Sequence, residues 1–163
     1  MPIKFIVDSM LGKLAVRLRL LGFDTTYYAD VEDSFLLRKA REEGRALLTH
    51  DLGLTKVRGA NASFITGRKL KDQVREVIHN FNLKIETDRL FTRCSVCNDL
   101  LRPVAKEQVK GKVPPLVLKT YNEFSYSPTC GHYYWKGSHY ARLVSEINAI
   151  LKSSPPYSPS PLS

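Results

Sequence analysis

Strand-like and helix-like patterns alternate along the first half of the chain, and this alternation limits the possible folds more than any other feature. Short β-prone runs predict strands at residues 3–7, 25–29, 46–49 and 63–66. Apolar residues at helical spacing predict helices at residues 10–21, 35–43 and 71–80, and residues 52–60 read as a short helix or a loop. Strands that alternate with helices form a parallel sheet covered by helices. We therefore expect a small α/β domain over residues 1–88.

Turn and capping residues mark the ends of these predicted helices. Gly22 and Gly44 follow the first two helical patterns and are expected to end them, because glycine favours the position after a helix. Asp33 or Ser34 is expected to cap the helix that begins near Phe35.

The composition changes after residue 88. Aromatic residues, turn residues and prolines dominate, and Pro103, Pro114, Pro115 and Pro128 break any long helix. We expect residues 89–151 to form a small β-rich, zinc-ribbon-like unit that ends in a helix at 142–151. The proline- and serine-rich residues 152–163 are expected to be a disordered tail.

The charge is strongly positive. The chain has 25 basic and 16 acidic residues, a net charge of +9, and nine of the basic against four of the acidic residues lie after residue 90. Such a balance favours a polyanionic partner, most often nucleic acid, and the alternative is a basic protein with no such partner. No window is apolar enough for a membrane span and the N-terminus does not read as a secretory signal, so we expect a cytoplasmic protein without a membrane partner.

Carboxylates follow two of the predicted strands. Asp8 and Asp51 each come after a strand, and Asp33 lies at the next helix start. Because ligands bind beyond the carboxyl ends of parallel strands, these side chains are expected to converge on Mg²⁺ or Mn²⁺, with the Thr49 hydroxyl beside a metal-bound water. The alternative is that the aspartates only favour turns and cap helices, and that Thr49 is simply a strand residue.

Basic residues follow Asp8 on the first predicted helix. Lys13, Arg17 and Arg19 are placed to hold phosphates beside the metal. The alternative is an ordinary charged, solvated helix face.

Three cysteines have the spacing of a zinc site. Cys94 and Cys97 form a Cys-x-x-Cys pair, and Cys130 follows with His132 two residues later. A second such pair would begin at position 127, which is a serine. His132 is therefore the first candidate for the fourth ligand and His139 the second. A ribbon that has lost its metal, or a bare pair of thiols, is the alternative.

Aromatic and basic residues are interleaved after the last cysteine. Trp135, Lys136 and His139 suit stacking on single-stranded bases with phosphate contact. Equally, Trp135 and the neighbouring tyrosines suit the small core that such a unit needs.

Four motifs in order resemble the Mut-seven C-terminal RNase domain family, a branch of the PIN-fold nucleases. They are Asp8-Ser-Met-Leu-Gly-Lys-Leu-Ala15 with Leu18-Arg-Leu-Leu-Gly22, Leu47-Leu-Thr-His-Asp51, Cys94-x-x-Cys97-Asn98, and the run from Cys130 to His139. The resemblance spans residues 3–145. It implies a PIN-like domain with a C-terminal zinc ribbon, and divalent-metal-dependent cleavage of RNA. It also implies that Asp8 and Asp51 bind the metal, with Asp33, or Asp30 in its place, as a further carboxylate and Thr49 beside them.

Two positions depart from that pattern. Ser127 replaces the third cysteine of the ribbon, and Asp72 is a weak candidate for a fourth acidic residue.

From these features together we expect a metal-dependent endoribonuclease that needs no small-molecule cofactor. A non-catalytic RNA-binding module is the alternative, and an adaptor built on the zinc unit is a third hypothesis.

Overall fold

The computed structural model, which describes residues 2–152, contains a four-stranded parallel sheet in the order β2-β1-β3-β4. The strands are β1 (Phe5–Val7), β2 (Thr25–Tyr27), β3 (Ala46–Thr49) and β4 (Ala62–Phe64). The helices between them are α1 (Gly12–Leu20), preceded by the 3₁₀ turn η1 (Ser9–Leu11), then α2 (Asp33–Glu43) and α3 (Leu52–Thr55). The predicted α/β class with a parallel sheet is confirmed.

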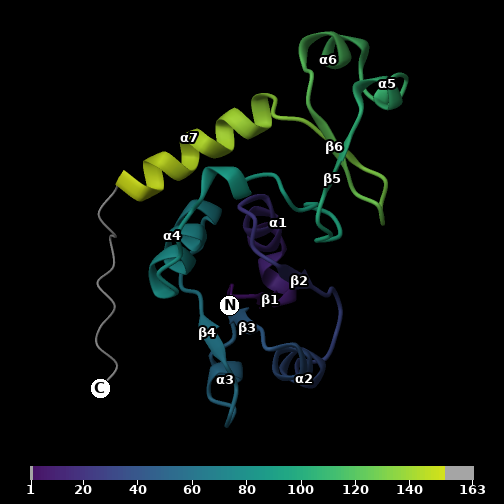
Figure 1. Ribbon diagram of the computed structural model, residues 1–163. Helices are drawn as coiled ribbons and strands as arrows, with labels where there is room; N and C mark the ends of the chain where they lie inside the picture. Colours follow the sequence, from purple (N-terminus) through teal and green to yellow (C-terminus); the bar gives the residue numbers. More distant parts are fainter. Residues whose placement is uncertain (1, 153–163) are drawn as a thin grey trace.

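Helices cover both faces of this sheet (Figure 1). On one face, Phe5 and Val7 of β1 pack in the main core with α1 and α4 (Leu70–Asn80). On the other face, Ile6 packs with residues of α2 and α3. Because successive side chains of a strand point to opposite faces, a three-residue strand such as β1 is wholly apolar when both faces are covered. This explains why these strands read as continuous apolar runs.

Gly22 ends α1 as predicted. Its φ is +95°, and the N–H of Phe23 donates to the carbonyl of Leu18 across the turn. A Cβ at this position would lie 2.6 Å from the carbonyl oxygen of Arg89. Glycine is therefore required both by the left-handed backbone and by the segment that contains η2 (Thr87–Arg89). Gly44 ends α2 as predicted, but the predicted start of that helix differs. Glu32 occupies the capping position and Asp33 is already helical, so neither Asp33 nor Ser34 is the cap.

The second half of the chain forms a three-stranded antiparallel sheet in the order β5-β6-β7. The strands are β5 (Arg102–Val104), β6 (Phe124–Tyr126) and β7 (Tyr133–Tyr134), and the short helices α5 (Lys106–Val109) and α6 (Pro115–Thr120) lie between the first two. We call residues 91–137 the ribbon. The predicted β-rich unit is confirmed, and its prolines limit it to short helices.

Helix α7 (Ser138–Lys152) leaves the ribbon and runs back across the α/β layer (Figure 1). Leu143, Ile147 and Ile150 are buried in the same core as α1 and α4. The helix begins four residues before the predicted start, and Tyr140 in this added turn packs edge-on against Phe91, with the ring centroids 5.3 Å apart. The division at residue 88 stays a prediction, since the last helix after it completes the core before it. The tail was expected at 152–163, but Lys152 is the last residue of α7, and residues 153–163 lie outside the described part.

Polar contacts join the ribbon to the parallel sheet. The carbonyls of Ser95 and Val96 each accept a hydrogen bond from the guanidinium of Arg19, at 3.0 and 3.1 Å. The side chain of Asn98 donates to Asp24 and accepts from the backbone N–H of Thr25. The loop that carries the first two cysteines is thereby docked on the start of β2. No helix within residues 2–152 is long and apolar enough to cross a membrane.

Candidate functional site

Asp8 and Thr49 meet where two neighbouring strands end. Asp8 directly follows β1, and its backbone N–H donates to the carbonyl of Leu48 at 3.0 Å. Thr49 is the last residue of β3, and its Oγ1 donates to Oδ2 of Asp8 at 2.7 Å. Since β1 and β3 are parallel and adjacent, their carboxyl ends fall side by side. The structure therefore brings together two of the predicted site residues.

Asp8 is a buried carboxylate held on both oxygens. Only 7% of the residue is exposed, and Ser9 Oγ donates to Oδ1 at 3.2 Å while Thr49 holds Oδ2. A buried charged group is costly unless it is hydrogen-bonded, and these two hydroxyls supply that compensation. The carboxylate consequently has a fixed position and orientation.

Asp51 is linked to the same network through the backbone. Its N–H donates to Thr49 Oγ1 at 2.9 Å, so the Thr49 hydroxyl bridges the two aspartates. Its Oδ1 accepts from the N–H of Gly53 at 2.8 Å and caps helix α3. The capping role that was the alternative for this residue is thus present. The cap uses one of the two carboxylate oxygens of Asp51, which is an exposed residue.

The hydrogen bonds that link Asp8, Thr49 and Asp51 do not include Asp33. It is the first residue of α2, is exposed, and makes no side-chain cap bond. Asp30, its substitute, is an exposed turn residue with a φ of +53°. Within residues 2–152, the three aspartates Asp8, Asp33 and Asp51 do not form a set whose oxygens all lie within 4.8 Å of one another. Mg²⁺ keeps several waters and needs only one or two direct carboxylates, so the hard oxygen donors Asp8 and Asp51 fit such an ion.

The loop after β4 is fixed by Glu76, a residue that the sequence analysis missed. Its carboxylate accepts from the N–H of Thr66 at 2.8 Å and from the N–H of Gly67 at 2.9 Å. Both N–H groups belong to residues about ten positions before Glu76 in the sequence, and no local sequence pattern indicates the contact. Asp72, the weak candidate for a fourth acid, is 3.3 Å from the guanidinium of Arg75 on the same helix. This pairing gives Asp72 a structural partner within α4.

The three predicted phosphate-binding residues differ in availability. Lys13 is exposed at the start of α1, next to the strand ends. Arg17 pairs with Glu146 of α7 at 3.2 Å. Arg19 is 7% exposed and bound to three backbone carbonyls, and burial lowers the pKa of its guanidinium. The prediction that Arg19 contacts phosphate stays a prediction. In this structure its Nε donates to the carbonyl of Thr25, and its Nη1 donates to the two carbonyls that dock the ribbon.

Other basic residues stand at the same edge of the sheet. Because β4 is parallel to β1 and β3, the loop that follows it emerges at the edge where Asp8 lies. Three exposed basic residues follow along that loop and the start of α4: Arg68, Lys69 and Lys71. They belong to no sequence motif, so none of them was among the predicted site residues. With Lys13 they place four exposed basic side chains at the edge that carries Asp8.

The cysteines form a compact cluster. The sulfurs of Cys94, Cys97 and Cys130 all lie within 4.8 Å of one another, and those of Cys94 and Cys130 are 3.3 Å apart. His132 Nδ1 is 3.0 Å from the sulfur of Cys130, but it does not join that set. Three thiolates at these distances suit Zn²⁺, which binds sulfur tetrahedrally. The predicted cysteine ligands are therefore together, whereas His132 contacts only one of them.

The electrostatics of the cluster favour a thiolate at Cys94. Burial raises its pKa, but hydrogen bonds from Tyr134 Oη and from backbone N–H groups outweigh this effect and lower the pKa to about 6. Burial and the neighbouring Cys94 raise the pKa of Tyr134 to about 12, so its hydroxyl stays protonated as a donor. Burial raises the pKa of the Cys97 thiol. Metal ligation requires deprotonated sulfur, and the lowered pKa of Cys94 favours that state.

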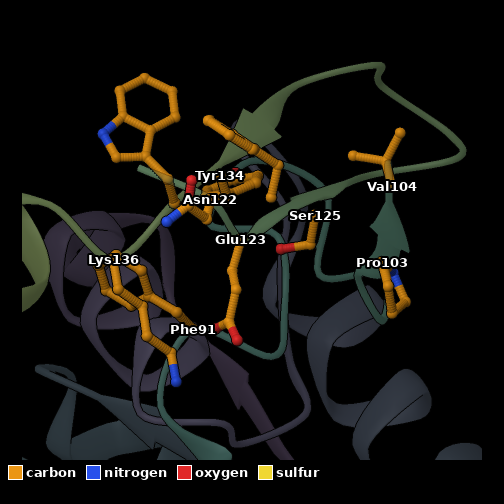
Figure 2. Close-up of a pocket in the computed structure, with 10 residues that line it drawn as sticks. Phe91, Pro103, Val104, Asn122, Glu123, Ser125, Tyr134 and Lys136 are labelled. Atoms are coloured by element: carbon orange, nitrogen blue, oxygen red, sulfur yellow. The ribbon is translucent and has the colours of Figure 1, made fainter. Parts of the chain in front are cut away.

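Two hollows flank the end of β7. One, of about 450 Å³, is lined by residues that include Phe91, Glu123, Trp135 and Lys136. Figure 2 shows its labelled residues reaching in from both sides, with Val104 of β5 opposite Lys136. The second, of about 650 Å³, shares three of its aromatic residues and adds His139.

Trp135 is half-buried between these hollows. It packs against Phe124 with the ring centroids 6.3 Å apart, so it serves the small core and still contributes to both hollows. Lys136 and His139 are exposed, and Lys136 Nζ lies 5.2 Å from the ring centroid of Tyr140. The two interpretations of the aromatic run are thus compatible in one structure.

Known proteins match the chain in sequence. It is 32% identical over 114 residues to the human exonuclease mut-7 homolog, an alignment that covers 66% of this chain and 13% of that protein. The chain thus corresponds to a small part of that relative. No solved structure matches it significantly. The model of the Mut7-C RNAse domain family matches residues 3–147, which include the strand-end aspartates and all three cysteines, and the chain belongs to this family of nuclease domains.

Proposed function

We propose that this chain is a divalent-metal-dependent endoribonuclease with a PIN-like catalytic domain, and that Asp8, Asp51 and Asp33 form its metal site. The observation that carries the proposal is the buried Asp8 carboxylate, held by Thr49 and joined through it to Asp51. This fixed carboxylate lies just beyond the carboxyl end of a parallel strand, which is where open α/β sheets bind their ligands. Membership of an RNase domain family supports RNA as the substrate.

Each residue has a distinct part in this proposal. A divalent cation held by the aspartates would supply an activated water and would neutralise charge on the phosphodiester. Asp8 provides a fixed oxygen donor, and the Thr49 hydroxyl holds Asp8 and Asp51 in position through its two hydrogen bonds. Lys13 and the basic residues after β4 position the phosphate backbone. Asp33 is included because it lies on the segment after β2, the third strand that ends at this edge.

The ribbon is proposed to hold the RNA strand. Trp135 and the aromatic residues around it provide faces on which unpaired bases stack, and Lys136 contributes positive charge beside them. The excess of basic residues after position 90 favours the same partner. Single-stranded RNA is therefore the proposed substrate.

Cleavage of an end-labelled single-stranded RNA tests the catalytic part. The protein is assayed with Mg²⁺, with Mn²⁺ and with EDTA, beside Asp8→Asn and a matched control, Asp88→Asn. Asp88 is exposed in η2, whose neighbour Arg89 contacts Gly22 at the far end of α1 from Asp8. Asparagine at position 8 can still accept the Thr49 hydrogen bond, so the variant is expected to fold.

We expect metal-dependent cleavage by the wild type and by Asp88→Asn, and a loss of at least about 10³-fold in Asp8→Asn. Equal cleavage by all three proteins would remove Asp8 from the mechanism.

The second candidate is a non-catalytic RNA-binding module. The capping bond from the N–H of Gly53 to the Asp51 carboxylate, and the absence of a tight three-aspartate set within residues 2–152, favour it. It predicts intact RNA under every metal condition and a mobility shift on a native gel that Asp8→Asn leaves unchanged.

A further inference from the structure

The loops that carry the cysteines have the same backbone structure. In the first, the N–H of Cys94 donates to the carbonyl of Asp99 at 2.8 Å, and the carbonyl of Cys94 accepts from the N–H of Asn98 at 2.9 Å. In the second, the N–H of Ser127 donates to the carbonyl of His132 at 2.9 Å, and the carbonyl of Ser127 accepts from the N–H of Gly131 at 2.9 Å. Each loop is thus closed by the same pair of hydrogen bonds.

The dihedral angles repeat as well. The fifth residue of each loop has a positive φ, which is 74° at Asn98 and 75° at Gly131. Only a few residue types adopt this conformation readily, and asparagine and glycine are the foremost of them. The repeat therefore sets up a one-to-one correspondence between the two loops.

This correspondence assigns a position to each candidate ligand. Cys130 corresponds to Cys97, Ser127 corresponds to Cys94, and His132 corresponds to Asp99. The first residue of each loop is fully buried, with Cys94 and Ser127 both 0% exposed. His132 is exposed, at a position that holds an aspartate in the other loop.

The side-chain contacts agree with the backbone. Ser127 Oγ lies 3.2 Å from the sulfur of Cys97 and accepts a hydrogen bond from the N–H of Cys130 at 3.3 Å. Its oxygen therefore faces the cluster from a buried position. The hydroxyl of Thr129 in the second loop bonds to Asp99 beside the first loop, so the two loops are also tied to each other.

We propose that Ser127 Oγ is the fourth protein donor of a metal site formed with Cys94, Cys97 and Cys130, and that His132 is not a ligand. The site takes Zn²⁺ through three thiolates and one oxygen. His132 Nδ1, at 3.0 Å from the sulfur of Cys130, donates a hydrogen bond to that thiolate from outside the ligand set. Such a site binds Zn²⁺ less tightly than four thiolates would, because sulfur is the softer ligand.

Metal binding by variants at positions 127 and 132 tests the assignment independently of RNA cleavage. The full chain is loaded with Zn²⁺ for metal analysis and for competition with a chromogenic chelator. It is loaded with Co²⁺ for absorption spectroscopy, because thiolate-to-cobalt charge transfer grows with the number of bound sulfurs. The variants are Ser127→Cys, Ser127→Ala and His132→Ala. Ser145→Cys adds a thiol on an exposed position of α7 and serves as the matched control.

We expect one Zn²⁺ per chain in the wild type. Ser127→Cys should raise the charge-transfer absorption by about a third, from three thiolates to four, and tighten Zn²⁺ binding at least about tenfold. Ser127→Ala should change the cobalt ligand-field bands and weaken binding about tenfold, with the thiolate absorption preserved. His132→Ala and Ser145→Cys should leave the cobalt spectrum unchanged.

Three results would overturn the proposal. The first is a ligand-field spectrum that changes in His132→Ala and not in Ser127→Ala, because His132 would then be the ligand. The second is a Ser127→Cys variant that gains no charge-transfer absorption over the Ser145→Cys control. The third is wild-type protein that binds neither Zn²⁺ nor Co²⁺.

Discussion

Replacement of Thr49 by valine removes one hydroxyl from the network that orders the strand-end aspartates. Thr49 is 0% exposed, and its Oγ1 donates to the buried carboxylate of Asp8 at 2.7 Å and accepts from the N–H of Asp51 at 2.9 Å. Valine has nearly the same shape, so the packing is retained while both hydrogen bonds are lost. Serine keeps the hydroxyl and loses only a methyl group.

The cost follows from these two bonds. A buried hydrogen bond to a charged acceptor contributes about 1.5–3 kcal/mol, and the second bond, to a half-buried N–H, contributes less. We expect Thr49→Val to lower the free energy of unfolding by about 2–3 kcal/mol, or the melting temperature by roughly 4–12 °C. Thr49→Ser should cost about 1 kcal/mol, for one buried methyl group.

Urea denaturation of the wild type and both variants measures this difference, and the RNA-cleavage assay runs beside it. Because Asp8 loses its orienting donor, Thr49→Val should also cleave at least about tenfold more slowly than Thr49→Ser. A valine variant that is as stable and as active as the serine variant would refute the assigned role of the hydroxyl.

Further predictions concern the docking of the ribbon, acid stability and RNA binding. Arg19→Met should lower the free energy of unfolding by about 3 kcal/mol, against under about 1 kcal/mol for Arg17→Met, and equal losses in urea denaturation would contradict the docking role. Burial raises the pKa of Asp24, but hydrogen bonds from its arginine and asparagine partners outweigh this and lower it below the usual 3.8. Its contribution to stability is therefore present above that pH and lost as the pH falls through the lower folded value. Asp24→Asn should be less stable at pH 7 and lose less between pH 4 and 2, and a steeper loss in acid melts would contradict the ion pair. Trp135→Ala should weaken binding of single-stranded RNA by about 1–3 kcal/mol in a titration, with the zinc content unchanged, whereas Phe35→Ala on α2 should leave binding intact.

The bounds of one strand, β3, followed from the sequence. Strand β3 has the predicted bounds of 46–49 because all four residues are buried and polar residues flank them on both sides. Helix α7 was predicted too short, because its first turn contains histidine and tyrosine rather than aliphatic residues. Its start is determined by a tertiary contact, the packing of Tyr140 on Phe91.

The candidate site was predictable where topology alone decides it. Parallel neighbouring strands bring Asp8 and Thr49 together, whatever the details of the loops. The role of Arg19 was not predictable, because two of its partners lie 76 and 77 residues further along the chain. The equivalence of Ser127 and Cys94 was visible in the spacing of the cysteines. The place of the Ser127 oxygen was not, because its burial and its contact with the sulfur of Cys97 depend on how the two loops fold together.

Cleavage of a covalently closed, single-stranded RNA circle tests the central claim most directly, because a circle has no end for an exonuclease to attack. With Mn²⁺ or Mg²⁺, the wild-type chain is expected to convert the circle to linear RNA and then to fragments. EDTA and Asp8→Asn should each leave the circle intact. A circle that survives with the wild type and metal, while linear RNA of the same sequence is degraded from its ends, would contradict an endonuclease. A circle cut equally by Asp8→Asn would contradict the strand-end site.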